Sequence, residues 1–211
     1  MLFGSIDYLN LLPFQVFMKK NSQYHANISK SKSVPSVVNS AFHKRRVNAA
    51  FISSVTSKRC KCTDVGIVGI GNVYSVLLVK GETKSDKASQ TSNQLAKVMG
   101  LDGEVMIGDR ALSYYLAGNE AIDLSAEWFN RTKLPFVFAR LCYHQHTIYI
   151  KNIATKFAHT KVFIPQYILK AEAEKRDISP RDARWYLEHI HYKLDYKAKK
   201  SLKIFLKSTF M

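Results

Sequence analysis

Short apolar runs alternate with amphipathic stretches along most of the chain. Met1–Tyr8 alternates weakly and predicts a first strand, and Pro13 suits the first turn of a helix that ends near Lys19 and Lys20. Apolar runs predict further strands at 28–32, 49–52, 65–68, 74–79, 105–107 and 134–139, and helical periodicity predicts helices at 33–44, 91–99, 108–116, 125–129, 153–157 and 167–174, with two more beginning at Ser179 and Asp195. Short strands alternating with helices indicate an α/β fold with largely parallel strands.

The middle third of the chain carries enough elements for a small lobe of its own. The chain would enter this lobe near Val79 and leave it near Phe138. The predicted division is residues 1–78 for the first part of lobe one, 79–138 for a smaller lobe two, and 139–211 for the C-terminal, mainly helical part of lobe one.

Composition narrows the class of protein. Of the 211 residues 46% are hydrophobic, which suffices for a substantial core, while 23% charged and 12% aromatic residues argue against disorder. No window holds the roughly 18 apolar residues that a membrane span needs. The first residues have no basic start and carry Asp7 early, unlike a secretory signal. These features predict a cytoplasmic protein.

The cysteines and histidines predict neither a disulfide framework nor a metal site. Three cysteines, an odd number, without a signal sequence argue against disulfides, and Cys60-Lys61-Cys62 lacks a second pair for zinc. Two His-X-His pairs, at 144–146 and 189–191, lack a third ligand. The second pair falls in a stretch that reads as helical, where an offset of two residues does not face one side.

The net charge of +16 is compatible with nucleic acid, an anionic membrane surface or an anionic small molecule. The basic residues are spread along the chain without one dominant block, and no RNA-binding signature accompanies them. We therefore expect mostly solvated surface charge with some bias toward anionic ligands, and no nucleic-acid or membrane partner.

Polar residues follow several predicted strands or open predicted helices. Asn10 falls in a turn between a strand and a helix, a common place for ligand contacts in open α/β sheets. Ser53-Ser54, Ser75 and Thr91-Ser92 lie at similar places, where hydroxyl and backbone N–H groups suit carboxylates. Each has a purely structural alternative: an Asx-turn for Asn10, a backbone-bonded hydroxyl for Ser53 and Ser54, a hinge for Ser75, and a helix cap for Thr91-Ser92.

Seven segments, in this order, resemble the chorismate dehydratase family of menaquinone biosynthesis. They are 6–14 (IDYLNLLPF), 49–54 (AAFISS), 72–76 (NVYSV), 89–92 (SQTS), 107–112 (IGDRAL), 123–128 (DLSAEW) and 134–139 (LPFVFA). The resemblance covers roughly residues 1–142, and the chain departs from the family pattern in a short lobe two.

The resemblance implies a two-lobed fold similar to type 2 periplasmic solute-binding proteins, with a cleft between the lobes. It implies conversion of chorismate to 3-[(1-carboxyvinyl)oxy]benzoate and water in the futalosine route, without metal or organic cofactor. Asn10 is then the expected catalytic residue, and the substrate-binding residues are expected to be Ser53, Ser54, Ser75, Thr91, Ser92 and Asp109.

No histidine lies in these segments, and Asp7 and Asp109 are the nearest carboxylates. Because a dianionic substrate would repel an ionised carboxylate, we hypothesise that a carboxylate of the substrate takes the ring proton. Three other functions stay open: 1,4-dihydroxy-6-naphthoate synthase of the same pathway, a non-catalytic anion-binding protein of the same fold, and a basic RNA-binding module.

Overall fold

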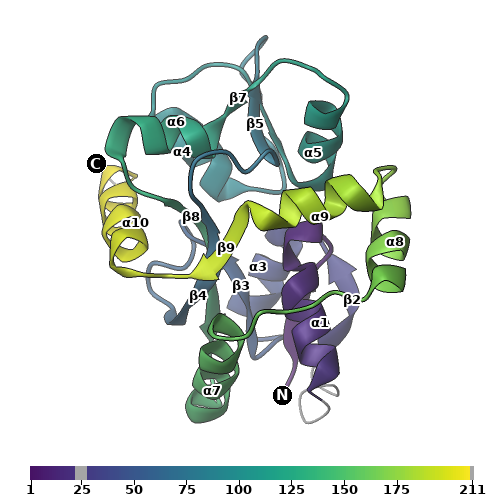
Figure 1. The fold of residues 1–211 in the computed structure, drawn as a ribbon. Coiled ribbons are helices and arrows are strands. Elements are labelled where there is room, and N and C mark those ends of the chain that lie inside the picture. The colour runs from purple at the N-terminus through teal and green to yellow at the C-terminus, as the bar shows by residue number, and fades with distance from the viewer. Residues whose placement is uncertain (22–27, 210–211) are drawn as a thin grey trace.

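The computed structural model describes residues 1–21 and 28–209, with only the backbone described for residues 28–32. The strands are β1 (Phe3–Ile6), β2 (Ile28–Ser33), β3 (Ala49–Ser53), β4 (Lys61–Gly69), β5 (Val76–Val79), β6 (Glu104–Ile107), β7 (Ile122–Asp123), β8 (Phe136–Tyr143) and β9 (Ile190–Lys193). The helices are the short 3₁₀ turn η1 (Leu9–Leu11) and α1 (Leu12–Lys20), α3 (Pro35–His43), α4 (Gln90–Val98), α5 (Gly108–Leu116), α6 (Leu124–Thr132), α7 (Thr147–Ala158), α8 (Gln166–Glu174), α9 (Pro180–Glu188) and α10 (Tyr196–Ser208). These elements form two sheets stacked end to end in the molecule (Figure 1).

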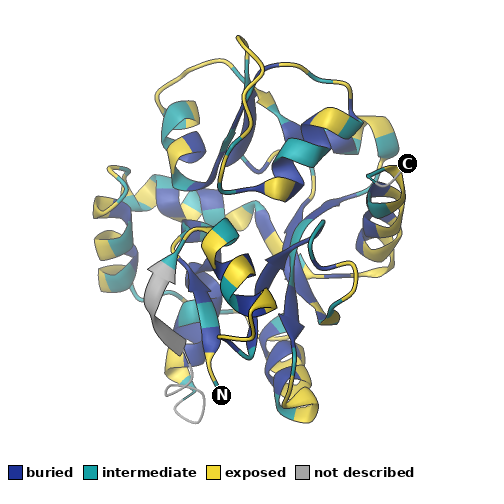
Figure 2. Ribbon diagram, turned by 180° about the vertical axis from the view of Figure 1, so that it is seen from behind, coloured by how far each residue is buried: buried dark blue, intermediate teal, exposed yellow. Residues whose placement is uncertain are grey.

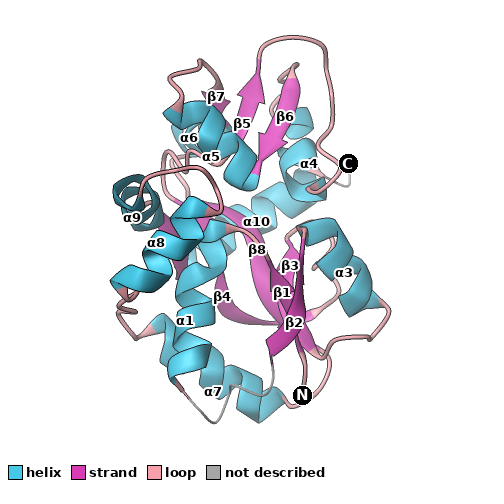
Figure 3. Ribbon diagram, turned by 90° about the vertical axis from the view of Figure 1, so that its right-hand side faces the viewer, coloured by secondary structure: helices cyan, strands magenta, loops and turns pink. Residues whose placement is uncertain are grey.

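The larger sheet has six strands in the order β2-β1-β3-β8-β4-β9, and the smaller has three in the order β6-β5-β7. Among the described residues β1 pairs in parallel with β2 and β3, whereas the other five strand pairings are antiparallel. The expectation of largely parallel strands is therefore wrong. The reason lies in the connection between the sheets: β4 leads out of the large sheet, β8 leads back into it, and the two lie side by side (Figure 3).

Aromatic side chains form the core of the larger sheet against α1 and α7. The ring of Phe14 lies 5.0 Å from that of Phe51 and 5.1 Å from that of Phe157. Helix α3 covers the opposite face (Figure 3), and its Val38 and Phe42 are buried. Buried and exposed positions accordingly alternate around the helices (Figure 2), as their amphipathic patterns predict.

Two helix caps differ from the sequence interpretation. The cap of α4 is Ser89, whose hydroxyl accepts the Ser92 backbone N–H, so Thr91 and Ser92 lie in the first turn. The cap of α6 is Asp123, whose carboxylate accepts from the backbone N–H groups of Ser125 and Ala126. In each case the better acceptor lies two or three residues upstream of the residue that the sequence pattern favoured.

Residues 190–193 form strand β9 instead of continuing a helix, so the helical interpretation of the second His-X-His pair is wrong. Helix α9 ends at Glu188, and β9 adds to the edge of the large sheet beside β4. Across the residues that the structure describes, no three His, Cys, Asp or Glu side chains gather in a way that would hold a metal ion.

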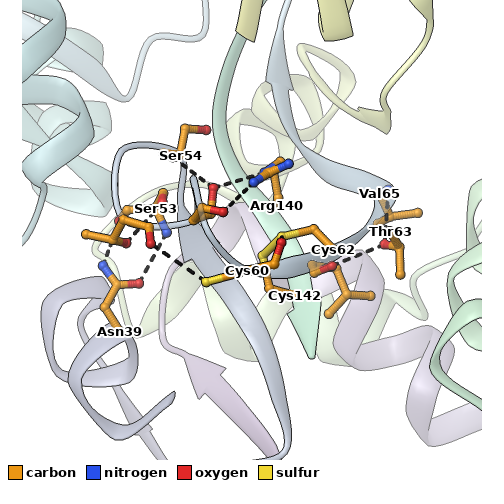
Figure 4. The surroundings of a disulfide bond; sticks show 12 residues. Asn39, Ser53, Ser54, Cys60, Cys62, Thr63, Val65, Arg140 and Cys142 are labelled. Atoms are coloured by element: carbon orange, nitrogen blue, oxygen red, sulfur yellow. Dashed lines mark hydrogen bonds between the residues drawn. A yellow bond between two sulfur atoms is a disulfide. The ribbon is translucent and has the colours of Figure 1, made fainter. Parts of the chain in front are cut away.

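Cys62 and Cys142 form a disulfide, which corrects the expectation of none. The antiparallel register of β4 and β8 places these two residues opposite each other, with Cα atoms 3.9 Å apart although 80 positions separate them in the chain (Figure 4). Counting cysteines could not show this pairing. The odd cysteine is Cys60, a partly buried free thiol. No described helix combines the length and apolarity needed to cross a bilayer.

Candidate functional site

A small cavity of about 70 Å³ lies where the two sheets meet. The larger sheet and its helices contribute one wall and the smaller sheet with α4 and α5 the other. Its lining residues are Ile6, Tyr8, Asn10, Leu11, Pro35, Phe51, Ser53, Ile67, Val73, Ser75, Val76, Ser89, Ser92, Ile107, Gly108, Phe138, Ala139 and Ile190. The cavity thus takes residues from segments far apart in the chain and from both sides of the β4 and β8 connection.

Four helical segments begin at this cavity. Pro35 is the first residue of α3, Gly108 is the first of α5, and Ser89 caps α4. Asn10 and Leu11 lie in η1, directly before α1. The first turn of a helix leaves backbone N–H groups without intrahelical acceptors, and the helix dipole is positive at that end. Convergence of several such ends favours a bound anion.

Three of the predicted serines line the cavity with their hydroxyl oxygens already engaged. Asn39 Nδ2 donates to Ser53 Oγ at 2.8 Å, and the phenol of Tyr186 donates to Ser75 Oγ at 2.9 Å. Ser89 Oγ donates in the same way to Ser92 Oγ at 2.9 Å. Each of the three hydroxyls is an acceptor within the protein, which leaves its own hydrogen available as a donor toward the cavity.

Asn10, the expected catalytic residue, also lines the cavity. Its backbone carbonyl accepts a hydrogen bond of 2.6 Å from the phenol of the buried Tyr192. Its side-chain amide has no hydrogen-bond partner among the described residues and is therefore available to a ligand, both as donor and as acceptor.

The other three predicted residues, Ser54, Thr91 and Asp109, bond to other parts of the protein. Ser54 is fully buried and donates to the Val137 carbonyl at 2.6 Å. Thr91 accepts the Val55 backbone N–H. Neither lines the cavity, so the structure brings Asn10, Ser53, Ser75 and Ser92 together and holds Ser54 and Thr91 just behind them.

Asp109 has both carboxylate oxygens engaged. Oδ1 accepts the Leu9 backbone N–H at 3.0 Å, and Oδ2 accepts from Arg176 Nε at 2.6 Å. Burial raises the carboxyl pKa, although the Leu9 N–H and Arg176 oppose this rise. Asp109 therefore joins α5 of the smaller-sheet side to η1 and to the turn that follows α8 on the larger-sheet side, and it does not line the cavity.

Sequence reasoning missed Tyr8 and Gly108, which bring the two walls into contact. Gly108 has a φ of 68°, and a Cβ atom there would lie 2.6 Å from the Tyr8 ring, so only glycine fits. Burial, followed by the charges of Asp86 and Asp109, raises the pKa of Tyr8 to about 12. Tyr8 accordingly lines the cavity as a neutral phenol at physiological pH.

Neutral groups make up the described lining. It contains no Asp, Glu, His, Lys or Arg side chain. An anion bound here would meet hydroxyls, an amide and helix N-termini, and apolar walls that exclude water strengthen such interactions.

The chain matches a family model described as menaquinone biosynthesis over residues 87–210. It is 45% identical to the chorismate dehydratase of Campylobacter jejuni over 216 residues, which covers 99% of this chain and 97% of that protein. The chain belongs to the chorismate dehydratase family. Both matches run beyond residue 142, where the sequence resemblance ended, and the Campylobacter jejuni relative is matched over nearly its whole length.

Two solved structures share the fold at low sequence identity. Protein AF1704 from Archaeoglobus fulgidus has a TM-score of 0.68 and 13% identity, covering 99% of this chain and 96% of that one. The alkanesulfonate-binding protein SsuA from Xanthomonas axonopodis has a TM-score of 0.58 and 10% identity, covering 99% and 92%. The predicted fold of solute-binding-protein type is thereby confirmed for this member of the chorismate dehydratase family.

Proposed function

We propose that the protein is a hydro-lyase that converts chorismate to 3-[(1-carboxyvinyl)oxy]benzoate and water in menaquinone biosynthesis, by the futalosine route. Chorismate carries two carboxylates, a ring hydroxyl and an enolpyruvyl ether. The proposal rests on the cavity, where three oriented serine hydroxyls and the free amide of Asn10 meet the N-termini of four helical segments. Such a donor set suits a dianion without any cationic side chain.

The reaction removes a ring proton and a hydroxide. Among the described lining residues no side chain is a base at neutral pH, because Tyr8 stays protonated and Asp109 is bonded elsewhere. We therefore propose that a carboxylate of the substrate takes the proton. The amide of Asn10 would donate to the departing hydroxyl, and Ser53, Ser75 and Ser92 would hold the carboxylates. Loss of water makes the ring aromatic, which drives the reaction forward.

Binding requires the two walls to separate. The cavity of about 70 Å³ is well below the roughly 300 Å³ at which ligand pockets begin. We propose that residues 79–138 move as lobe two relative to residues 1–78 and 139–211. The two sheets joined by β4 and β8 support two such lobes, with the whole of β5 (Val76–Val79) moving with the smaller sheet and the whole of β8 (Phe136–Tyr143) staying with the larger one. Opening would part Gly108 from Tyr8, and closing would exclude water from the bound substrate.

We also propose that the protein acts in the cytoplasm on chorismate alone, without nucleic acid or membrane. The Cys62–Cys142 disulfide points the other way, because cytosolic thiols are mostly kept reduced. The redox state of this pair in the cell therefore bears directly on the proposed location.

The test is to incubate the purified protein with chorismate and follow the products by liquid chromatography with mass spectrometry. We expect an aromatic product lighter than chorismate by one water. Asn10→Ala should lower kcat by roughly 10² or more, as loss of a transition-state donor does. Asn119→Ala, in the exposed loop after α5, should leave kcat unchanged.

The alternatives give different results. A thermal shift with chorismate but no product would indicate an anion-binding protein, and formation of 1,4-dihydroxy-6-naphthoate from its precursor would indicate the sister enzyme. If Asp109→Asn bound chorismate normally but lost nearly all turnover, Asp109 would be the base and the substrate-assisted step would be wrong.

A further inference from the structure

A second concave site lies on the outer side of the β4–β8 connection, beside the disulfide. It is a groove of about 620 Å³ bounded by β4, β8 and α10, and it shares no lining residue with the cavity between the sheets. Its volume falls in the range of small-molecule pockets, roughly 300 to 1,000 Å³.

The groove is strongly basic. Five cationic side chains line it, whereas Asp64 is its one described acid, and this carboxylate pairs with Lys199 at 2.7 Å. The five cations are Lys58, Arg140, Lys199, Lys203 and Lys207. They come from three separate parts of the sequence, which explains why the charge looks scattered along the chain while the fold concentrates it.

Arg140 is the partly buried cation of this groove. Its guanidinium is held by Ser57, which accepts from Nε at 2.9 Å through its hydroxyl and from Nη2 through its carbonyl. Burial lowers its pKa, and no carboxylate pairs with it among the described residues. A guanidinium has five N–H donors, so a fixed and partly desolvated Arg140 keeps donors for an anion.

Three lysines of α10 also favour a bound anion in this groove. Lys199, Lys203 and Lys207 are spaced four residues apart and therefore lie on one face of the helix, where like charges repel and weaken it. The helix nevertheless turns this face toward Arg140, and an anion between them would relieve the repulsion.

We propose that this groove binds a soluble small molecule through a phosphoryl group that carries at least two negative charges. Arg140 from β8 and Lys203 and Lys207 from α10 would contact the phosphoryl oxygens. The groove's volume of about 620 Å³ is that of a small-molecule pocket, so a small ligand is the proposed occupant instead of a membrane surface or a duplex.

The test is calorimetric titration of the full-length protein with inorganic pyrophosphate at two salt concentrations. The pair Lys203→Gln and Lys207→Gln removes two charges from the groove, and the pair Lys197→Gln and Lys200→Gln removes two charges from α10 outside it. We expect the wild type to bind, the first pair to weaken binding by about tenfold or more, and the second by less than about threefold. Turnover of chorismate should be the same in both, which shows that both variants are folded.

Other outcomes overturn the proposal. Equal weakening in the two double variants would mean that only net charge matters. Sedimentation with vesicles of phosphatidylglycerol that depends on Lys203 and Lys207, without binding of pyrophosphate, would assign the groove to lipid headgroups. Absence of binding to either probe would mean that the groove is solvated surface.

Discussion

Replacing Tyr186 by Phe tests whether the serine donors of the cavity are oriented from behind. Tyr186 is 1% exposed, and its phenol donates to Ser75 Oγ at 2.9 Å. Burial keeps the pKa of this phenol well above its usual value, so it donates at any working pH. Without the phenol, the Ser75 hydroxyl can turn its hydrogen away from the substrate.

The expected loss follows from the strength of one neutral hydrogen bond. A net contribution of about 0.5–1.5 kcal/mol corresponds to a decrease in kcat/KM of roughly twofold to tenfold. Tyr143→Phe is the matched control, because Tyr143 is also buried but its hydroxyl bonds to no other described residue. The control should leave kcat/KM within experimental error.

A double-mutant cycle separates orientation from a general structural effect. Ser75→Ala alone should lower kcat/KM, and adding Tyr186→Phe to it should cost little more, because the phenol acts through that hydroxyl. If the two effects multiply instead, or if Tyr186→Phe alone leaves kcat/KM unchanged, the inference that Tyr186 orients Ser75 is refuted.

Three further predictions concern stability. The side chain of Arg176 is almost buried and bonds to Asp109 at 2.6 Å, so Arg176→Gln should lower the free energy of unfolding in urea by about 3 kcal/mol. The control Lys170→Gln removes an exposed ion pair and should change it by less than about 0.5 kcal/mol. Equal effects would contradict a buried salt bridge at Arg176. Reduction of the Cys62–Cys142 disulfide should cost about 2–4 kcal/mol of stability. Because Cys142 is buried, the thiols are counted by alkylation in denaturant, which should label one thiol without reductant and three with it; three labelled thiols without reductant would show that the bond is absent. Folded Tyr8 has a pKa of about 12 and keeps a proton that an unfolded tyrosine releases near pH 10. The wild type should therefore lose stability relative to Tyr8→Phe as pH rises from about 10 to 12. A constant difference in unfolding free energy between the two proteins across that pH range would contradict a buried phenol.

The sequence predicted the cavity residues that follow from strand and helix ends. Ser53 ends a strand, Asn10 and Ser92 lie in the first turns of helical segments, and Ser75 directly precedes β5. The fold brings these element ends to one place. It could not predict their supports, because Asn39 and Tyr186 are 14 and 111 positions away from the serines they hold.

Long-range pairing also explains the errors in the fold. Cys62 and Cys142 meet only through the antiparallel register of β4 and β8, which local periodicity does not encode. Strand β9 is four residues long and directly follows a helix, so its helical context concealed it until it paired with β4. The same limit hid the groove around Arg140, whose lysines come from a distant helix.

Because the cavity lining is uncharged, we expect salt to affect the association and dissociation rate constants of the ligand differently. Salt screens the long-range attraction between the +16 surface and a dianion, so the association rate constant should fall with ionic strength. The contacts proposed to retain the ligand are short hydrogen bonds from the neutral groups of the lining, and salt hardly weakens them once the cavity has closed on the ligand. Dissociation should therefore proceed at nearly the same rate in dilute and in concentrated buffer.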